Sequence, residues 1–154
     1  FSLPDVISKA LAGIAAGAGE KSITVTSNVH PSVGQIVGDE FSINEMITNL
    51  LFNAVKYTPH SGTVHLEAKD RDDCVEIDVI DTGIGIPADE IGEVFDEFFR
   101  ASNAKMFRPD GTGLGLHIAT MLSEKIGGKI SFESEEKEGT TFYLRIPKGS
   151  GNNY

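Results

Sequence analysis

Two glycine-rich segments stand about thirty residues apart in this chain, and together they could bind a nucleotide. They read Asp81-Thr-Gly-Ile-Gly-Ile-Pro87 and Gly111-Thr-Gly-Leu-Gly-Leu116. Glycine lets the backbone approach a base or a phosphate without a Cβ in the way. A helix that begins just after such a loop directs its free N–H groups at an anion. The pair of loops therefore predicts a nucleotide site, which neither loop would justify alone.

A polar set precedes both loops on a predicted amphipathic helix. Asn49, Asn53 and Lys56 are four and three residues apart, so they project from one side of that helix. Amide oxygens are hard ligands suited to Mg²⁺, which takes its other oxygens from water and from substrate phosphates. A lysine one turn later can meet those phosphates. Taken alone, the three residues fit a solvated polar face better than a site, and only the loops downstream favour a binding site.

Each loop suggests a different contact. Asp81 follows an apolar strand, and its carboxylate can accept a hydrogen bond from an exocyclic amine, although a simple strand-ending turn is the alternative. Ile86 offers an apolar wall for a base. The glycines of the second loop, at 111, 113 and 115, could hold phosphate oxygens through their N–H groups. A dinucleotide-binding fold is excluded because the spacing is GxGxG after a polar segment, and a Walker loop because GxxxxGK[ST] does not occur.

The elements that must position these residues follow from apolar periodicity. The first predicted helix starts at Pro4 and ends in the glycine-rich region 13–19. Ser42 and Glu45 have capping-box spacing, which predicts that the main helix opens there and ends before Pro59. Further helices are predicted from Pro87 to about residue 98, with Ile91, Val94, Phe95 and Phe98 on one face, and over 114–126. Extended segments are predicted over 23–28, 35–37, 63–69, 74–80, 129–133 and 140–146.

The order of these elements predicts a fold class. Helices and mostly antiparallel strands in mixed order favour a two-layer α/β (α+β) sandwich, with a mixed sheet covered on one face by about three helices. Residues from about Arg100 to Asp110 are polar and without a sustained period, directly before the second glycine loop. They could form a movable cover over a ligand, or a plain connecting loop.

Length and composition limit the other possibilities. A chain of 154 residues suits one domain, which we expect over 1–148, followed by a flexible tail at 149–154. A net charge of −10 opposes general attraction to nucleic acid or anionic lipid, so we expect neither partner. We recognise no membrane span and no signal peptide, and the single Cys74 fits a packing role in a reducing compartment. Because the chain begins at Phe1, we expect it to be a piece of a longer parent.

These residues carry a family resemblance. Asn49-Leu-Leu-Phe-Asn53-Ala-Val-Lys56-Tyr57 resembles the N box of the catalytic, ATP-binding domain of sensor histidine kinases, within the larger group that includes gyrase, the Hsp90 chaperones and MutL. Segments 81–87 and 111–116 resemble the first and second G boxes, 95–100 the F box and 139–142 a further short G box. The motifs occur in the family's order over about residues 39–147. Lys137 and Ser42 depart from the pattern, where glycine and arginine are usual.

The resemblance implies the Bergerat α/β sandwich, with ATP under a mobile lid, and it assigns roles. Asn53 would bind Mg²⁺ with help from Asn49, Asp81 would bond the adenine amine, and Tyr57 and Ile86 would flank the base. Asn53, Lys56 and Arg100 would be the catalytic residues, and Lys105 and Arg108 in or beside the lid could neutralise phosphate charge or be merely solvated. The nucleotide-contacting positions implied are Asn49, Asn53, Lys56, Tyr57, Asp81, Gly83, Gly85, Ile86, Lys105, Arg108, Gly111, Thr112, Gly113, Leu114, Gly115, Leu116 and Thr141.

Two comparisons within the resemblance favour a kinase over an ATPase. The ATPase branch carries a glutamate as general base one turn before the metal-binding asparagine, where this chain has Asn49, so direct hydrolysis looks disfavoured. None of the four histidines, His30, His60, His65 and His117, lies in a motif like the family's H box. We therefore expect the acceptor histidine in a dimerisation and phosphotransfer domain of the parent chain, or in another protein.

The resemblance also implies partners and leaves alternatives open. We expect a response regulator as the downstream partner, a cytoplasmic location with a parent that could be membrane-anchored, and no direct membrane contact by this piece. A serine protein kinase of the anti-sigma type uses the same motif order. A nucleotide-binding interaction module without transfer activity is the alternative from another class.

Overall fold

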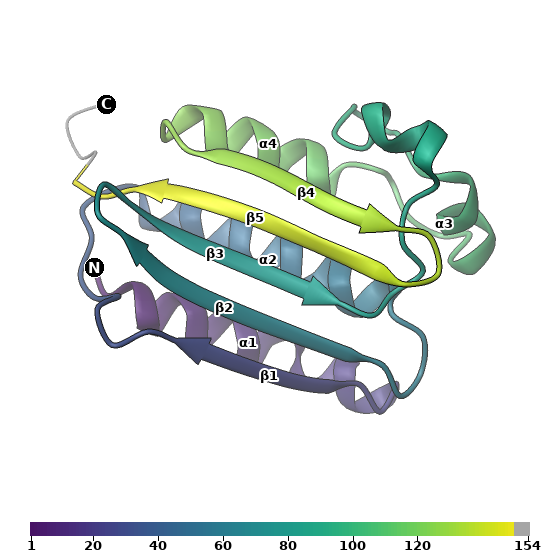
Figure 1. Ribbon diagram of the computed structural model, residues 1–154, viewed down its shortest axis with the longest axis horizontal. Coiled ribbons are helices and arrows are strands. Elements are labelled where there is room, and N and C mark those ends of the chain that lie inside the picture. The colour runs from purple at the N-terminus through teal and green to yellow at the C-terminus, as the bar shows by residue number, and fades with distance from the viewer. Residues whose placement is uncertain (150–154) are drawn as a thin grey trace.

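The computed structural model describes residues 1–149 of the chain. A flexible tail was predicted over 149–154, and residues 150–154 of this segment lie outside the described residues. Helices and strands follow one another in mixed order along the sequence (Figure 1). In chain order they are α1 (Leu3–Glu20), β1 (Thr24–Val29), α2 (Glu40–Tyr57), β2 (Thr63–Arg71), β3 (Cys74–Asp81), the 3-10 helix η1 (Ala88–Glu93), α3 (Ser102–Phe107), α4 (Gly115–Lys125), β4 (Lys129–Glu135) and β5 (Gly139–Pro147).

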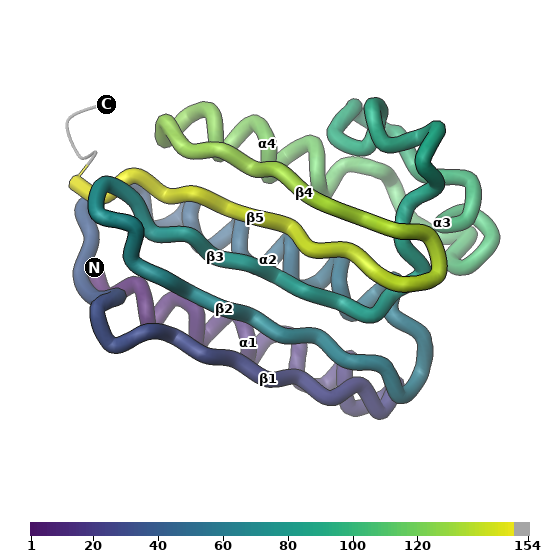
Figure 2. Tube along the Cα trace, viewed as in Figure 1, coloured from purple at the N-terminus to yellow at the C-terminus, as the bar shows by residue number. Residues whose placement is uncertain are grey.

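The strands form one mixed sheet with the order β1-β2-β3-β5-β4. β1 and β2 are parallel, and the other neighbouring pairs are antiparallel. The trace in Figure 2 shows that α3 and the segments around it lie at one end of this sheet, beside the turn between β4 and β5. The predicted fold class, a mixed and mostly antiparallel sheet in two layers with helices, is confirmed.

The hydrophobic core lies between the sheet and α1, α2 and α4, which cover one of its faces (Figure 1). In β2, Val64, Leu66 and Ala68 are fully buried and alternate with more exposed residues, as a strand with one face on a core requires. The apolar residues of α2 recur at helical spacing on the buried side, where Ile47, Leu50 and Leu51 have no exposed surface. The buried stripe turns the opposite side of α2, which carries the asparagines, away from the sheet.

α1 continues through the glycine-rich region, so the predicted end within 13–19 is wrong. Ile14 and Ala18 extend the buried stripe of Ile7 and Ala10 for two more turns, and this packing outweighs the low helix propensity of the glycines. Gly17 faces Val55 of α2, where a Cβ would lie 3.9 Å from the valine methyl. A Cβ at Gly13 or Gly19 would meet open space, so the packing of α1 on α2 does not depend on these glycines.

α2 begins three residues earlier than its capping-box spacing predicted. The N-cap is Asp39, whose Oδ1 accepts a hydrogen bond from the Ser42 backbone N–H at 3.1 Å, while Oδ2 accepts from the Ser42 hydroxyl at 2.8 Å. Ser42 is thus a buried residue of the first turn rather than the cap. The end is as predicted: Thr58 leaves helical geometry before Pro59, and its hydroxyl donates to the Ala54 carbonyl at 2.7 Å. The predicted extended piece at 35–37 is reduced to one bridge between Gln35 and Ser2.

The segment after Pro87 differs most from its prediction. Only the short η1 forms, and the predicted common face is lost because Ile91 and Phe98 are exposed. Phe98 has a φ of 63°, and its N–H donates to the Gly113 carbonyl at 3.1 Å. The chain leaves helical geometry because it must pack against the second glycine loop. Val94 and Phe95 still face inward: Val94 is buried, and the Phe95 ring lies 5.4 Å from that of Phe132.

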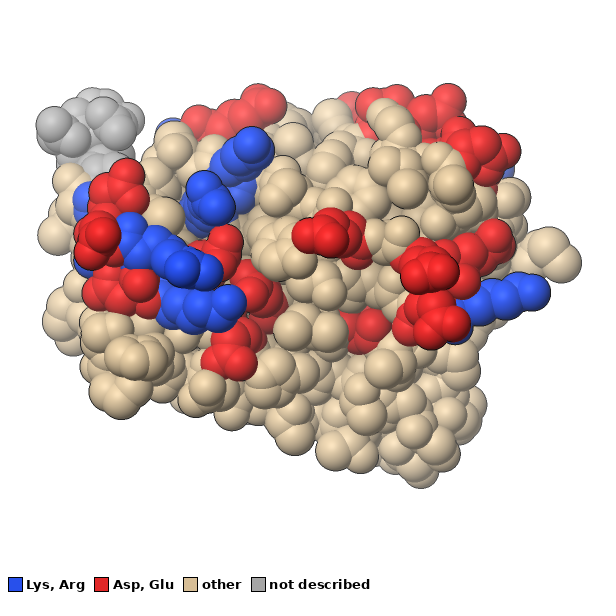
Figure 3. Space-filling model, viewed as in Figure 1, with Lys and Arg blue, Asp and Glu red and all other residues tan. Residues whose placement is uncertain are grey.

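The outer face of the sheet carries charges of both signs: most of its Lys and Arg side chains gather over the left end in Figure 3, mixed with acids, and further Asp and Glu side chains lie toward the right end. Glu76 and Asp78 lie there among the side chains of Lys69, Arg71 and Arg145. The ion pair between Lys69 and Asp78 has an N–O distance of 3.2 Å. Within residues 1–149, every helix is too short or too polar to cross a membrane.

Candidate functional site

A cavity of about 440 Å³ opens at the end of the sheet where β3 finishes. Its walls come from α2, the loop after β3, the lid (residues 100–110), the second glycine loop and the first residues of β5. This volume lies within the range of small-molecule sites, which is roughly 300–1,000 Å³. The lining residues that the sequence predicted are Asn49, Asn53, Lys56, Tyr57, Asp81, Gly85, Ile86, Arg100, Thr112, Gly113, Leu114, Gly115 and Leu116.

α2 forms one wall with the predicted polar residues. Asn49, Asn53 and Lys56 all line the cavity, because the apolar stripe of the helix is turned toward the sheet. The Lys56 ammonium also lies 5.3 Å from the centre of the Tyr57 ring. Gly115 begins α4 opposite this wall, and a Cβ there would lie 3.7 Å from the Asn49 amide oxygen. Amide oxygens, an ammonium and the N-terminus of α4 therefore gather at one side of the cavity.

Asp81 forms the other side of the cavity and is 8% exposed. Its Oδ1 accepts hydrogen bonds from the backbone N–H groups of Gly83 at 2.8 Å and Thr140 at 3.2 Å. Burial raises the pKa of the Asp81 carboxyl to about 6, although the two N–H donors act in the opposite direction. Since both donors are on Oδ1, Oδ2 is left for a ligand.

The β5 residue beside this carboxylate is Thr140. The sequence analysis predicted Thr141 at the site, which is wrong by one position. Asp81 pairs with Thr140 across β3 and β5, and Thr140 is buried at the cavity. Thr141 pairs with Ile80 and belongs to the opposite face of the sheet. Because successive strand residues point to opposite faces, a one-residue difference decides which threonine reaches the site.

The first glycine loop is held from two sides. The Ile84 N–H donates to the Tyr57 carbonyl at 3.1 Å, and the Ile86 N–H donates to the Ser134 hydroxyl at 2.9 Å. At Gly83 a Cβ would lie 2.7 Å from both Asp81 Oδ1 and the Tyr57 carbonyl oxygen, so the tight turn requires glycine. Gly83 supports Asp81 in this way without lining the cavity.

The hairpin between β4 and β5 completes the support for this loop. Gly85 has a φ of 69°, and a Cβ there would collide with the Glu135 carbonyl. The Lys137 N–H donates to the Ile84 carbonyl at 2.7 Å. Lys137 has a φ of 72°, a backbone conformation that favours glycine, which accounts for the residue that the family pattern has at this position.

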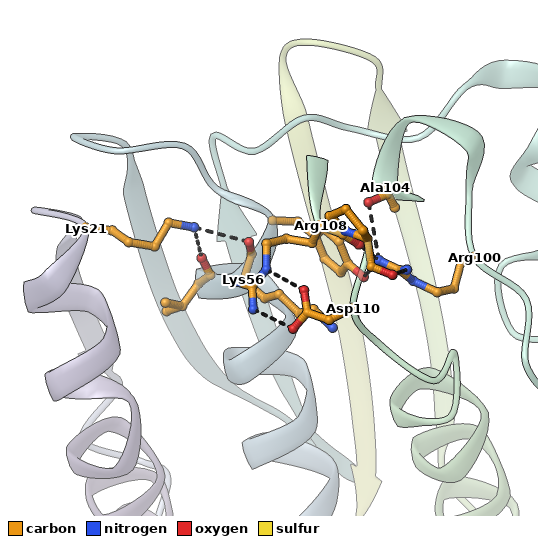
Figure 4. A network of polar contacts seen from close by, with 9 residues as sticks. Lys21, Lys56, Arg100, Ala104, Arg108 and Asp110 are labelled. Atoms are coloured by element: carbon orange, nitrogen blue, oxygen red, sulfur yellow. Dashed lines mark hydrogen bonds and ion pairs between the residues drawn. The ribbon is translucent and has the colours of Figure 1, made fainter. Parts of the chain in front are cut away.

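Arg100 connects the lid to α2 (Figure 4). Its Nη2 donates to the Tyr57 hydroxyl at 3.1 Å, to the Ala104 carbonyl at 3.2 Å and to the Arg108 carbonyl, while Nη1 donates to the Pro109 carbonyl at 3.0 Å. Its Nε is buried and has no partner among the described residues. The guanidinium thus fixes the curvature of the lid at the cavity wall.

The lid contains the short helix α3, which the sequence did not predict. The Glu90 carboxylate accepts from the Ser102 N–H at 3.0 Å and from its hydroxyl at 2.9 Å, at the start of α3. Asn103 Nδ2 donates to the Gly85 carbonyl at 2.9 Å. At the other end of α3, the Lys21 ammonium lies 5.3 Å from the centre of the Phe107 ring. The lid is therefore docked on the first glycine loop and on the corner between α1 and α2.

Lys21 was missed because it lies outside every recognised motif. Its ammonium donates to the carbonyls of Val55 at 2.8 Å and Lys56 at 3.1 Å, at the C-terminus of α2 (Figure 4). Burial, and secondarily the charge of Arg108, lower the pKa of Lys21. A cation at this position stabilises the helix end that carries Lys56 and Tyr57.

Other predicted positions lie beside the cavity rather than in it. Lys105 is exposed on the lid, and Arg108 forms an ion pair with Asp110. Gly111 is packed against the Lys56 ammonium. The lining residues that sequence reasoning missed are Phe52, Ile84, Val94, Phe99, Ala101, Ala104, Ile118, Thr140 and Phe142. Most are apolar, and periodicity assigns such residues to a core; position next to a motif was the only signal available.

The fold and site define a nucleotide-binding α/β sandwich of the histidine-kinase type, and comparison with known proteins agrees. Residues 38–150 match the family described as Histidine kinase-, DNA gyrase B-, and HSP90-like ATPase, and the chain belongs to this family. An uncharacterized sensor-like histidine kinase of Rhizobium meliloti is 36% identical over 147 residues, which are 96% of this chain and 28% of that protein. The sensor-like histidine kinase SenX3 of Mycolicibacterium smegmatis is 34% identical over 143 residues, 93% of this chain and 37% of that protein.

Solved structures of histidine kinases share the fold. The catalytic domain of histidine kinase ThkA superposes with a TM-score of 0.83 at 26% identity, covering 97% of this chain and 96% of that one. Full-length ShkA, solved in complex with AMPPNP, has a TM-score of 0.83 at 29% identity, covering 97% of this chain and 30% of that one. The chain is therefore an ATP-binding catalytic domain of the kind found in sensor histidine kinases. It spans well under half the length of the two relatives named above.

Proposed function

We propose that this domain binds ATP in the cavity and presents the γ-phosphoryl group to a histidine outside the described residues. The adenine amine donates to Asp81 Oδ2, and Tyr57 and Ile86 flank the base. The triphosphate extends toward Asn49, Asn53 and Lys56, beneath Gly113 and Gly115. ShkA was solved with AMPPNP, a nucleoside triphosphate analogue, which supports this assignment by likeness.

The observation that carries the proposal is the distribution of carboxylates around the cavity. Among the described lining residues, Asp81 is the sole acid, and its Oδ1 is already bonded to two backbone N–H groups. The position one turn before Asn53 is Asn49, an amide that cannot remove a proton from water. Transfer to an imidazole requires no such base, because positioning and charge neutralisation carry most of phosphoryl transfer. The site therefore favours transfer over hydrolysis.

Mg²⁺ fits the donor set. The described residues contain no group of three His, Cys, Asp or Glu side chains that could hold a metal ion. Asn49 and Asn53 offer neutral oxygens at the side of the cavity where Lys56 stands, so the ion would complete its shell with phosphate oxygens and water. Bound there, Mg²⁺ would neutralise charge on the phosphates. Lys56 and Arg100 would orient the same phosphates through direct donors.

The acceptor and the partners lie beyond this chain in the proposal. Among the described residues, no histidine lines the cavity. His117 Nδ1 is 3.2 Å from the Phe95 carbonyl, and its Nε2 is 3.3 Å from the Glu97 carboxylate. The acceptor histidine would belong to a dimerisation and phosphotransfer domain of the parent, which would pass the group to a response regulator in the cytoplasm.

The test is transfer of label from ATP carrying ³²P at the γ-position, using the full parent chain and its Asn53→Ala variant. We expect label in the native protein that is lost in acid and survives alkali, as the P–N bond of phosphohistidine requires, and little label in the variant. Label that survives acid instead supports a serine kinase. Nucleotide binding without any label in the native parent supports a non-catalytic binding module. Either of these results contradicts the proposal.

A further inference from the structure

Asp110, at the end of the lid, holds a cation that the sequence assigned to phosphates. Its Oδ1 accepts from Arg108 Nε at 3.1 Å, and its Oδ2 accepts from Arg108 Nη2 at 3.1 Å (Figure 4). Two parallel bonds between a guanidinium and an oxyanion form the strongest geometry available to arginine, and phosphate accepts the same fork. The carboxylate therefore occupies the donors that a phosphate would use.

Lys56 adds a second cation to this carboxylate. Gly111, the next residue, has a φ of 136°, and a Cβ there would lie 2.7 Å from the Lys56 ammonium. The backbone beside Asp110 is thus packed directly against a lining residue of the cavity. The hydrogen bonds from Arg108 and the charges of Arg108 and Lys56 lower the pKa of Asp110 to about 2. Asp110 is therefore ionised throughout the neutral range.

The arrangement places one negative charge where polyphosphate charge must enter. Lys56 lines the cavity, and the Arg108 carbonyl accepts a hydrogen bond from Arg100, another lining residue, whereas the proposed adenine contact is at Asp81 on the other side. Phosphates that reach Lys56 meet repulsion from Asp110 and must also compete with it for Arg108. A nucleoside without phosphates meets neither effect.

We propose that Asp110 is a specificity-determining residue, a carboxylate that competes with nucleotide phosphates for Arg108 and Lys56 and weakens binding more as the number of phosphates increases. The inference rests on the proposed function, because it assumes that nucleotide binds in this cavity. Asp110 lies outside the motif segments. Replacing a residue that contacts ATP should lower the affinity for ATP, whereas replacing Asp110 should raise it.

The experiment is calorimetric titration of the native chain and Asp110→Asn with ATP, ADP, AMP and adenosine at low salt. We expect Asp110→Asn to bind ATP about two- to fivefold more tightly, the gain to decrease from ATP to AMP, and adenosine to bind equally to both. The gain should decrease in 0.5 M salt, since exposed charges are screened (about 3–5 Å Debye length). Asp110→Glu keeps the charge and should resemble the native chain. Asp89→Asn removes an exposed acid outside the motif segments, whose side chain has no hydrogen bond or ion pair among the described residues, and serves as the matched control.

Repeating the Asp110→Asn substitution in an Arg108→Gln variant distinguishes competition for Arg108 from a general effect of removing one negative charge. In Arg108→Gln, Asp110→Asn should give a smaller gain for ATP than in the native chain, because Arg108 is no longer there to be released. Equal gains in both backgrounds, or an equal effect from Asp89→Asn, would overturn the proposed competition. Unchanged affinity of Asp110→Asn for all four ligands overturns this inference and leaves the proposed function intact. No binding of any nucleotide by the native chain overturns both.

Discussion

Replacing Asp81 with asparagine should stabilise the fold and destroy the site at the same time. The two backbone N–H groups on Oδ1 fix the orientation of the new side chain, because the amide oxygen must take their place. The amide nitrogen then stands where Oδ2 was and presents a donor to the adenine amine, which is itself a donor. Two donors facing one another in a buried site should weaken ATP binding by about 100-fold or more.

The gain in stability follows from the pKa of the buried carboxyl. Its value is raised from the ordinary 3.8 to about 6. The folded chain therefore binds the proton more tightly, and its stability decreases as the pH rises from about 4 through 6. Above that window the ionised group costs about 3 kcal/mol. Asp81→Asn removes the charge, so we expect it to raise the free energy of unfolding by about 1–3 kcal/mol at pH 8 and to have little effect at pH 4.

Urea denaturation of both proteins at pH 4, 6 and 8, with ATP titration at pH 8, measures the two effects. Asp89→Asn, which replaces an exposed acid outside the motif segments, is the matched control and should change neither quantity. A loss of stability at pH 8 in Asp81→Asn would refute the view that the carboxylate is held at a cost in folding. Unchanged ATP affinity would refute the assigned contact with the adenine amine.

Two further predictions concern the supports of the site. Gly85→Ala should lower the free energy of unfolding by about 2 kcal/mol or more, because its φ of 69° and the Glu135 carbonyl leave no room for a Cβ. Gly92→Ala is the control, because a Cβ there meets open space. Equal urea midpoints for the two variants would contradict the reasoning. Lys21→Met should cost about 1 kcal/mol and speed amide exchange in the lid, since two carbonyls lose their donor. Lys9→Met on the exposed side of α1 is the control and should leave amide exchange in the lid unchanged. Equal amide protection of the lid in Lys21→Met and Lys9→Met would contradict a role for Lys21 in holding the lid.

The periodicity of α2 predicted which side of the helix faces away from the core, and the glycine loops downstream predicted that this side forms a wall of a site. Leu50 and Leu51 are buried and Asn49 and Asn53 line the cavity, because a single helical period separates the two sets. The orientation of a single helix or strand with one buried side can therefore be predicted from its own sequence, without knowledge of contacts to other segments.

Features that depend on pairing between distant segments could not be predicted from the sequence. Thr140 rather than Thr141 reaches the cavity because β5 pairs with β3 in a register that opposes Thr140 to Asp81. The residues from Ile91 to Phe98 have helical spacing, yet the chain turns there because Phe98 must bond to Gly113. Both outcomes were decided by contacts between segments far apart in the sequence.

The central claim is that this cavity binds ATP with Mg²⁺, and calorimetric titration of the native chain and Asn53→Ala, each with and without Mg²⁺, tests it most directly. The account predicts that the native chain binds ATP more tightly with Mg²⁺, and that Asn53→Ala loses most of this dependence while still binding the nucleotide. Absence of binding by the native chain under both conditions would contradict the account, as would an unchanged Mg²⁺ dependence in Asn53→Ala.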